Sequence, residues 1–326
     1  MLFDGKYKTQ GRTILTDEGL MMLSSADTFE FNAVCEDRVS IYITAKGENT
    51  DVYFTVYIDG ERKNARFHVS EGKNVIIPAT DLKKGVHNIK LVRQTEWDRG
   101  DIYVTDVEIK GELSDPPEDR KVFIEFVGDS LVTGYGNQPN EWSEIEWGGA
   151  SAYQDATKAY PYMIGEALGC DVSVVAIQGI GTSCGGWEFT MNEIYENYPR
   201  VKEKDYIYSP KRSADIVVVH LLGNDKYEYE NRGFTLDYVF EKAEELCRMV
   251  RAKHPNAAVI FCPADYCEQG ARMIEEKLGG AENGYYSTIL YMDALGKGGH
   301  PSVAGHESAV EALLPIIKKI IEEKNE

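Results

Sequence analysis

The fold is decided by the stretch VFIEFVGDSLVTGYG, residues 122–136. Its first half is rich in β-branched and aromatic residues, as in a strand buried on both faces, and Gly128 lets the backbone turn where the apolar run stops. Ser130 is therefore expected at the carboxyl end of a strand, the edge of an open α/β sheet where ligands bind. The alternative is that Asp129 or Ser130 only caps the following helix.

The chain after residue 122 alternates strand-like and helical patterns, which indicates an α/β domain. Helical spacing of apolar residues is clearest over 238–250 and again from residue 306 to about residue 324. The other buried-strand runs cover residues 172–177, 216–222 and 258–262. We expect these runs to lie side by side with the strand that precedes Ser130.

Residues 1–113 follow a period of two instead. Runs such as residues 52–58 and 102–109 alternate their side chains between two faces, and turn signals such as Asp59-Gly60 separate the runs. We expect about eight to ten antiparallel strands in a β sandwich, enough for a jelly roll. This domain is either structural or a carbohydrate-binding module. The polar, proline-containing segment 114–121 predicts a linker, so that the α/β domain spans residues 122–326.

Composition limits the partners of the chain. The sequence has 326 residues and a formal net charge of -19, which repels phosphate backbones and anionic membranes. Neither nucleic acid nor a membrane is an expected partner, and the oligomeric state stays open. No signal peptide and no membrane-spanning stretch is visible, which predicts a cytoplasmic protein as the sequence stands, or a secreted one if a signal peptide has been removed.

The cysteines form no Cys-x-x-Cys pair. Several lie in apolar runs, where a thiol behaves as a small core residue, so free thiols in a reducing compartment are expected. The six positions are Cys35, Cys170, Cys184, Cys247, Cys262 and Cys267.

A serine needs a base before it can act as a nucleophile, and His300 is the best candidate. It lies in the loop Gly298-Gly-His300-Pro-Ser, away from any apolar periodicity. His220 lies inside a buried-strand run, and His254 ends a helix. His306 is expected to start a helix, where it packs or caps.

Acyl transfer also needs donors for the oxyanion of the tetrahedral intermediate. Two loops qualify, because each follows a predicted strand and offers amide hydrogens. One contains Gly179 and Gly181, and the other contains Asn224. Taken singly, each is also an ordinary strand-to-helix turn. Together with Ser130 and His300, they place four loops at the ends of successive strands.

The order Ser130, Gly179, Asn224, His300 resembles the four blocks of the SGNH (GDSL-type) hydrolase superfamily. This resemblance implies a three-layer, flavodoxin-like hydrolase domain over about residues 122–326. A β sandwich followed by Gly-Asp-Ser and a Tyr-Gly pair further resembles carbohydrate esterase family 2. Members of that family join a jelly roll to an SGNH domain and remove acetyl groups from plant polysaccharides. This second resemblance covers nearly the full chain.

Two departures from the superfamily pattern stand out. The third block is usually Gly-x-Asn-Asp, whereas here Gly223 directly precedes Asn224. The aspartate usually found three residues before the histidine is Lys297 here. Some relatives use a Ser-His dyad in which a backbone carbonyl accepts the second imidazole proton. A carbonyl within 296–299 is the first candidate for that support, and Asp293 is the second, as a triad acid.

The resemblance implies a two-step acyl transfer. His300 would take the proton of Ser130, while the N–H groups of Ser130 and Gly179 and the amide of Asn224 receive the oxyanion. Trp187 would stack on a sugar or be partly buried, and Asp225 is a further candidate for substrate binding. Trp142 and Trp147 carry the same ambiguity as Trp187. No metal or other cofactor is expected.

Three functions remain open from the sequence. The first is an esterase that removes O-acetyl groups from poly- or oligosaccharides. The second is an SGNH esterase or thioesterase acting on small acyl or lipid esters. The third is a noncatalytic carbohydrate-binding protein, suggested by Lys297 in place of the aspartate.

Overall fold

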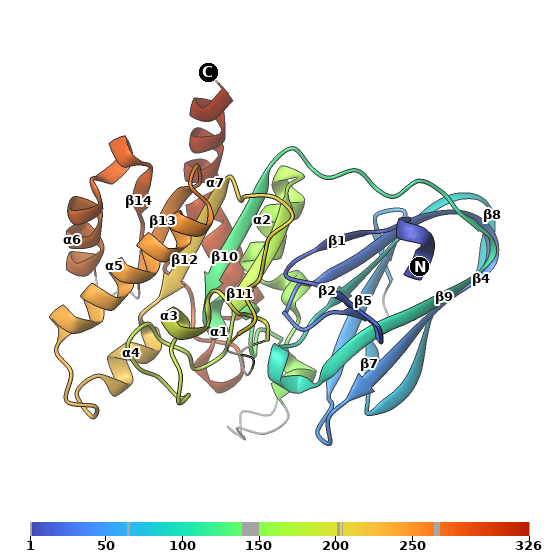
Figure 1. Ribbon diagram of the computed structural model, residues 1–326, viewed down its shortest axis with the longest axis horizontal. Coiled ribbons are helices and arrows are strands. Elements are labelled where there is room, and N and C mark those ends of the chain that lie inside the picture. The colour runs from blue at the N-terminus through green and yellow to red at the C-terminus, as the bar shows by residue number, and fades with distance from the viewer. Residues whose placement is uncertain are drawn as a thin grey trace. The chain divides into compact units, whose positions relative to one another are not determined.

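A computed structural model describes residues 2–63, 66–138, 150–200, 203, 205–263 and 268–325. The chain divides into two units, Met1–Arg120 and Lys121–Glu326 (Figure 1). The division falls inside the segment 114–121 that the sequence predicts as a linker.

The first unit consists of antiparallel strands. Within the described ranges, nine strands form one ladder in the order β2-β3-β9-β4-β8-β5-β6, with β1 beside β4 and β7 beside β5. The strands are β1 (Lys8–Gln10), β2 (Ile14–Thr16), β3 (Gly19–Met21), β4 (Thr28–Lys46), β5 (Val52–Ile58), β6 (Glu61–Arg62), β7 (Phe67–Val69), β8 (Gly72–Arg93) and β9 (Asp101–Leu113). Two short 3-10 helices accompany them, η1 (Leu2–Gly5) and η2 (Trp97–Arg99).

Alternating burial along the long strands builds the core of this unit. Phe29, Phe31 and Ala33 of β4 are all buried, with more exposed residues between them. The register of β4 against β8 shifts on both sides of Asp37, which has a φ of 70°. Such bulges bend a strand, so a long strand can serve both layers of a sandwich. The predicted antiparallel β sandwich is thus confirmed.

The second unit has a parallel five-stranded sheet in the order β11-β10-β12-β13-β14. The strands are β10 (Phe123–Gly128), β11 (Asp171–Ala176), β12 (Ile216–Leu221), β13 (Ala258–Pro263) and β14 (Tyr285–Ser287). The helices are α1 (Ser130–Thr133), α2 (Tyr160–Leu168), α3 (Met191–Ile194), α4 (Gly223–Glu228), α5 (Leu236–Lys253), α6 (Glu268–Leu278) and α7 (Val303–Asn325). The 3-10 helices among the described residues of this unit are η3 (Ala150–Tyr153), η4 (Ala156–Lys158), η6 (Gly280–Asn283) and η7 (Lys297–Gly299).

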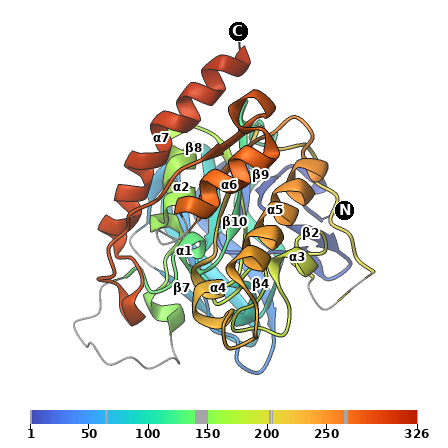
Figure 2. The same ribbon diagram turned by 90° about the vertical axis from the view of Figure 1, so that its left-hand side faces the viewer.

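Helices cover both faces of this sheet. Helix α2 packs against α7, whereas α5 packs against α3 and α6, which Figure 2 shows in front of the sheet. The apolar stripe of α5, which includes Val239, Ala243 and Leu246, is fully buried, and Thr235 caps the helix start. The sequence predicts this α/β arrangement, and the structure confirms it. No helix within the described ranges combines the length and the apolar character needed to cross a bilayer.

The strand order places the functional candidates at one edge. Strand β10 lies between β11 and β12. The next strand in the chain, β11, is therefore on one side of β10, and the following strands, β12 to β14, are on its other side. Ligands bind outside the carboxyl ends of parallel strands at such a reversal. Ser130 follows β10, and Asn224 follows β12.

Candidate active site

A cavity of about 620 Å³ opens at this edge of the sheet. Four loops meet around it, and the residues that they contribute are mostly glycine, aromatic or polar. The lining consists of Asp129, Ser130, Leu131, Tyr135, Gln178, Gly179, Gly186, Trp187, Gly223, Asn224, Tyr227, Gly298, Gly299 and His300. The volume falls within the range of sites for small ligands.

Ser130 begins α1, and Asp129 caps that helix. The Asp129 carboxylate accepts a hydrogen bond of 2.9 Å from the Leu131 N–H. Gly128 allows close packing at this point, because a β-carbon there would lie 2.2 Å from Val132 Cγ2 and 2.5 Å from the carbonyl oxygen of His220. The capping interpretation therefore applies to Asp129, which leaves the Ser130 hydroxyl available to the cavity.

His300 contacts that hydroxyl. Its Nε2 lies 3.0 Å from Ser130 Oγ, and its Nδ1 lies 3.2 Å from the carbonyl oxygen of Lys297. A carbonyl can only accept a hydrogen bond, so Nδ1 carries the proton and Nε2 is free to accept from the serine. Burial lowers the pKa of His300, although its bond to the Lys297 carbonyl acts in the opposite direction. The imidazole is thus held neutral and oriented as a base.

Asp293, the second predicted support for His300, has its hydrogen bonds with Leu295 and Ser302. One carboxylate oxygen of Asp293 accepts from the N–H groups of Leu295 and Ser302, at 3.1 and 2.7 Å, and the other accepts from the Ser302 hydroxyl at 2.6 Å. Burial raises its pKa, but the bonds from Ser302 outweigh this effect and leave the pKa lowered. Asp293 therefore holds the segment that leads into α7.

Lys297 supplies the backbone acceptor that the sequence predicts within residues 296–299. Its side chain points to another partner, because Nζ lies 4.3 Å from the ring centre of Tyr153. Gly298 and Gly299, with φ of 68° and 74°, form the tight turn that brings His300 back to the Lys297 carbonyl. The substitution of lysine for aspartate thus leaves an acceptor in place.

The two predicted oxyanion donors both line the cavity. Gly179 has a φ of 74°, which favours glycine. The Asn224 side-chain amide donates to Asp129 Oδ2 at 3.1 Å and to the Ile180 carbonyl at 2.9 Å. These bonds fix the orientation of the amide at the carboxyl end of β12.

Leu222 explains the departure in the third block. It adopts a left-handed conformation with a φ of 82°, although leucine is disfavoured there. The usual pattern Gly-x-Asn-Asp would place its glycine at this position, two residues before Asn224. Here the buried Leu222 occupies this position in a strained conformation, a feature often found at functional sites.

Asp225, predicted as a further residue for substrate binding, is not among the residues that line the cavity. Its side chain is 0% exposed, and its carboxylate accepts from the N–H groups and hydroxyls of Thr182 and Ser183 and from the Cys184 N–H. The nearby charge of Asp225 and, above all, burial raise the pKa of Asp129 to about 7. Asp225 therefore anchors the loop that follows Gly179.

Two aromatic side chains flank the cavity. Trp187 is half-buried, donates from Nε1 to the Gln178 carbonyl at 2.6 Å, and stacks on Phe189. Trp187 is thus partly buried and lines the cavity, and its stacking on a sugar stays a prediction. Tyr227, which is 75% exposed, lies three residues after Asn224 on α4 and was missed from the sequence. The helical spacing from Asn224 could have indicated it.

Several other predicted positions lie elsewhere. His306 is buried in α7, where its Nδ1 accepts from the Tyr160 N–H at 3.3 Å. Trp142, Trp147 and Cys267 lie outside the described residues. Among the residues that the structure describes, no group of three His, Cys, Asp or Glu side chains is arranged to hold a metal ion.

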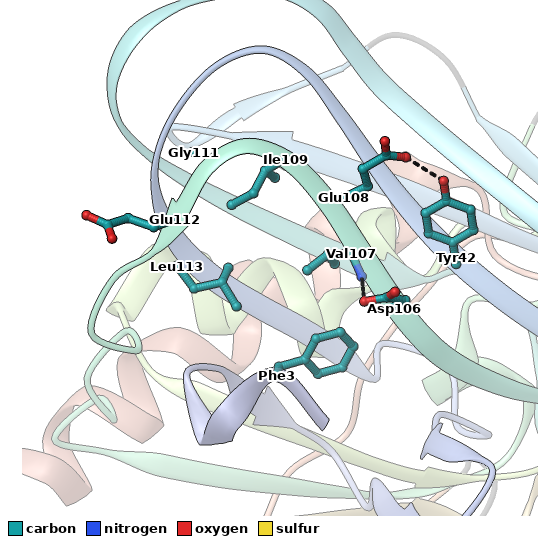
Figure 3. A pocket seen from close by; sticks show the side chains of 9 residues that line it. All are labelled: Phe3, Tyr42, Asp106, Val107, Glu108, Ile109, Gly111, Glu112 and Leu113. Carbon is teal, nitrogen blue, oxygen red and sulfur yellow. Dashed lines mark hydrogen bonds between the residues drawn. The ribbon is translucent and has the colours of Figure 1, made fainter. Parts of the chain in front are cut away.

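The β unit has a hollow of its own, of about 570 Å³ (Figure 3). Phe3, Val107 and Leu113 lie on one side of it, and Tyr42 donates to Glu108 on the other. The lining contains no histidine, serine or cysteine, so it has no counterpart of the Ser130–His300 pair.

Family comparisons agree with this architecture. Residues 9–117 match the family model "Carbohydrate esterase 2 N-terminal", and residues 126–307 match "GDSL-like Lipase/Acylhydrolase family". A curated relative, the cellulase/esterase CelE of Acetivibrio thermocellus, is 24% identical over 298 residues, which cover 86% of this chain. The match spans only 35% of the length of CelE.

Solved structures share the fold. A family two carbohydrate esterase from Clostridium thermocellum, in complex with cellohexaose, has a TM-score of 0.86 at 20% identity, covering 97% of this chain and 99% of that one. The acetyl xylan esterase Est2A from the rumen bacterium Butyrivibrio proteoclasticus has a TM-score of 0.84 at 17% identity, covering 98% and 96%.

The predicted resemblance is thereby confirmed in both halves, and the predicted class of carboxylic ester hydrolase agrees with the second match. That match extends over more than half of the sequence and includes Ser130, Gly179, Asn224 and His300. The chain belongs to the GDSL-like Lipase/Acylhydrolase family.

Proposed function

We propose that this protein is a serine esterase that removes O-acetyl groups from plant-type poly- or oligosaccharides. The observation that carries the proposal is the 3.0 Å contact between Ser130 Oγ and His300 Nε2, with Nδ1 directed to the Lys297 carbonyl. This arrangement is a Ser-His dyad with backbone support. The carbohydrate esterase 2 match of the β unit supports a carbohydrate ester as substrate.

The first step is acylation. Ser130 Oγ attacks the acetyl carbonyl carbon as His300 Nε2 takes its proton, and the carbonyl oxygen becomes an oxyanion. The N–H groups of Ser130 and Gly179 and the Asn224 amide receive this charge. Since Asn224 already donates to Asp129 and Ile180, it must share one of those hydrogens with the oxyanion.

Collapse of the tetrahedral intermediate breaks the bond to the sugar oxygen, which leaves with the proton from His300. Water then attacks the acetyl-enzyme, and His300 Nε2 takes a proton from this water. Release of acetate returns the proton to Ser130 Oγ. The Lys297 carbonyl holds the imidazole in one tautomer throughout both steps.

The cavity favours a sugar over a long acyl chain. Its lining is mainly glycine and polar side chains, with the aromatic faces of Trp187 and Tyr227 at its sides. Aromatic rings stack on the apolar faces of sugars, whereas a lipid site needs a broad apolar cleft. Trp187 and Tyr227 are therefore proposed to contact the carbohydrate.

Hydrolysis of p-nitrophenyl acetate by the wild type and by Ser130→Ala tests the catalytic function. Loss of either member of a nucleophile-base pair costs on the order of 10⁶ in kcat, so the variant should show only background rates. Equal rates would favour a noncatalytic carbohydrate-binding protein instead.

A panel of esters tests the substrate class. Acetylated xylan and mannan oligosaccharides should be better substrates than butyryl or longer acyl esters. A preference for long acyl chains, lost in Ser130→Ala, would instead favour the second candidate, an esterase or thioesterase of small acyl or lipid esters.

A further inference from the structure

Two backbone segments cross beside His300 without a side chain between them. The Lys297 N–H donates to the Gly136 carbonyl at 2.8 Å. A β-carbon at Gly136 would lie 2.6 Å from the Lys297 carbonyl oxygen, and a β-carbon at Gly296 would lie 2.6 Å from the Gly136 carbonyl oxygen. Distances this short do not occur between real side chains and backbone, so each crossing position requires glycine.

The Lys297 carbonyl oxygen, which leaves no room for a β-carbon at Gly136, is also the atom that orients His300. The Lys297 carbonyl accepts from His300 Nδ1 at 3.2 Å. Tyr135, the neighbour of Gly136, packs its ring 4.8 Å from the His300 ring. The segment after the nucleophile therefore contacts both the imidazole and the group behind it.

We propose that Gly136 is a positioning residue for His300: its missing side chain lets the Lys297 carbonyl lie where it holds the imidazole against Ser130. The inference rests on the proposed function, because it concerns proton transfer between Ser130 and His300. In a Ser-carboxylate-His triad, a separate side chain would orient the histidine. Here the nucleophile's own loop does so through the backbone.

Gly136→Ala tests this inference, with Gly169→Ala as its matched control. Gly136 has a φ of 66° and Gly169 a φ of 61°, so alanine meets similar backbone strain at both positions. A β-carbon at Gly169 has no atom within 4 Å, whereas at Gly136 it meets the Lys297 carbonyl. The difference between the variants therefore isolates the contact with that carbonyl.

We expect Gly136→Ala to lower kcat on p-nitrophenyl acetate by about 10- to 100-fold with little change in KM, since misplacement by about 1 Å can cost about 10²-fold. Gly169→Ala should remain within about threefold of the wild type, because it changes stability alone. Equal losses of kcat in the two variants would overturn the inference.

The pH dependence of kcat/KM distinguishes a positioning role of Gly136 from a role in stability alone, because loss of stability alone would leave the acidic limb at the same pH. The hydrogen bond that His300 Nδ1 donates to the Lys297 carbonyl raises the pKa of His300, against the larger effect of burial, which lowers it. If Gly136→Ala weakens that bond, the pKa falls, and the acidic limb of kcat/KM moves to lower pH. An acidic limb at the wild-type pH, or at a higher one, would contradict the inference.

Gly296→Ala keeps the test decisive if Gly136→Ala does not fold. Gly296 has a φ of -78°, which alanine adopts without strain, yet its β-carbon would press on the Gly136 carbonyl at the same crossing and on the carbonyls of His300 and Pro301. The same loss of kcat and shift of the acidic limb are expected, and wild-type values would overturn the inference. Failure of the proposed function is distinguishable, because Ser130→Ala would then match the wild type.

Discussion

The carbonyl oxygen of Lys297 is neutral, whereas the aspartate usual at this point of the superfamily carries a full charge. Either acceptor keeps the proton on Nδ1 of His300 and leaves Nε2 to face Ser130. Only a carboxylate would also stabilise the imidazolium that forms during the reaction. His300 therefore keeps its orientation but gains less help with charge, and burial lowers its pKa.

Asp293→Asn should leave kcat/KM within about fivefold of the wild type, because loss of a true triad carboxylate costs about 10⁴. The asparagine oxygen can still accept from Ser302, so the entry into α7 should persist. Lys297→Met is the companion variant: it removes the cation over Tyr153 but keeps the carbonyl, and should also stay active. Ester hydrolysis and circular dichroism give the comparison. A loss of several thousand-fold in Asp293→Asn with an unchanged fold would make Asp293 the triad acid.

Sequence reasoning singled out Ser130 and His300, which lie 3.0 Å apart, but not every contact around them. Asp225 follows Asn224 directly and looks like a site residue, yet its hydrogen bonds to residues 182–184 join positions about 40 apart along the chain. The strain at Leu222 is equally invisible, because leucine gives no signal for a positive φ. Such contacts depend on which loops lie side by side in the folded chain. The sequence pattern within one loop does not contain this information.

Among the elements, the loop after β11 depends on one buried carboxylate. Asp225 receives five hydrogen-bond donors from Thr182, Ser183 and Cys184, and the loop they form follows Gly179. A carboxylate is suited to this task because it only accepts hydrogen bonds. An amide in its place would turn a donor toward some of these N–H groups.

Asp225→Asn should therefore destabilise the α/β unit by about 2 kcal/mol, the cost of leaving buried polar groups unsatisfied. For a unit of this size the melting temperature should fall by about 4–8 °C. We also expect a lower kcat, because the Gly179 loop loses its anchor. Asp237→Asn, at an exposed position in the first turn of α5, is the control and should change the melting temperature little. An unchanged melting temperature for Asp225→Asn would contradict the role of this residue.

Element boundaries were predicted well where strands are buried on both faces. The run at 216–222 became β12, Ile216–Leu221, because six consecutive apolar or buried positions leave no alternative. In the β unit, by contrast, Lys84-Gly85 looks like a turn between two strands. The structure continues β8 through this point: Gly85 pairs with Cys35 of β4, and the register shifts between Gly85 and Leu82. Cross-strand pairing overrode the local turn signal there.

At the scale of the whole molecule, the two units contain ionisable groups whose pKa shifts have opposite effects on stability as the pH falls. In the α/β unit, burial lowers the pKa of His220 to about 4 and that of His306 to about 3. Below pH 6.5 the unfolded chain binds these protons while the folded unit does not, so stability falls as the pH drops from 6.5 toward 4. Asp129, with its pKa raised to about 7, opposes only part of this loss.

In the β unit the balance is reversed. Burial raises the pKa of Asp27 to about 7, and hydrogen bonds to Lys83 and Asp59 raise the pKa of His87. Both groups bind protons more readily in the folded unit than in the unfolded chain. Their contribution to stability is therefore present at low pH and is lost as the pH rises through their folded pKa values.

Acidification from pH 7 to pH 5 should consequently move the unfolding transitions of the two units in opposite directions. Each group contributes a slope of about 1.4 kcal/mol per pH unit between its two pKa values. Calorimetry at both pH values should show the α/β transition falling and the β transition rising. Asp27→Asn assigns the transitions, because it should remove most of the rise in the β unit and leave the α/β shift unchanged. If both transitions moved in the same direction, this account would be contradicted. The pKa shifts predict that folding releases protons in the α/β unit and takes up protons in the β unit over this pH range.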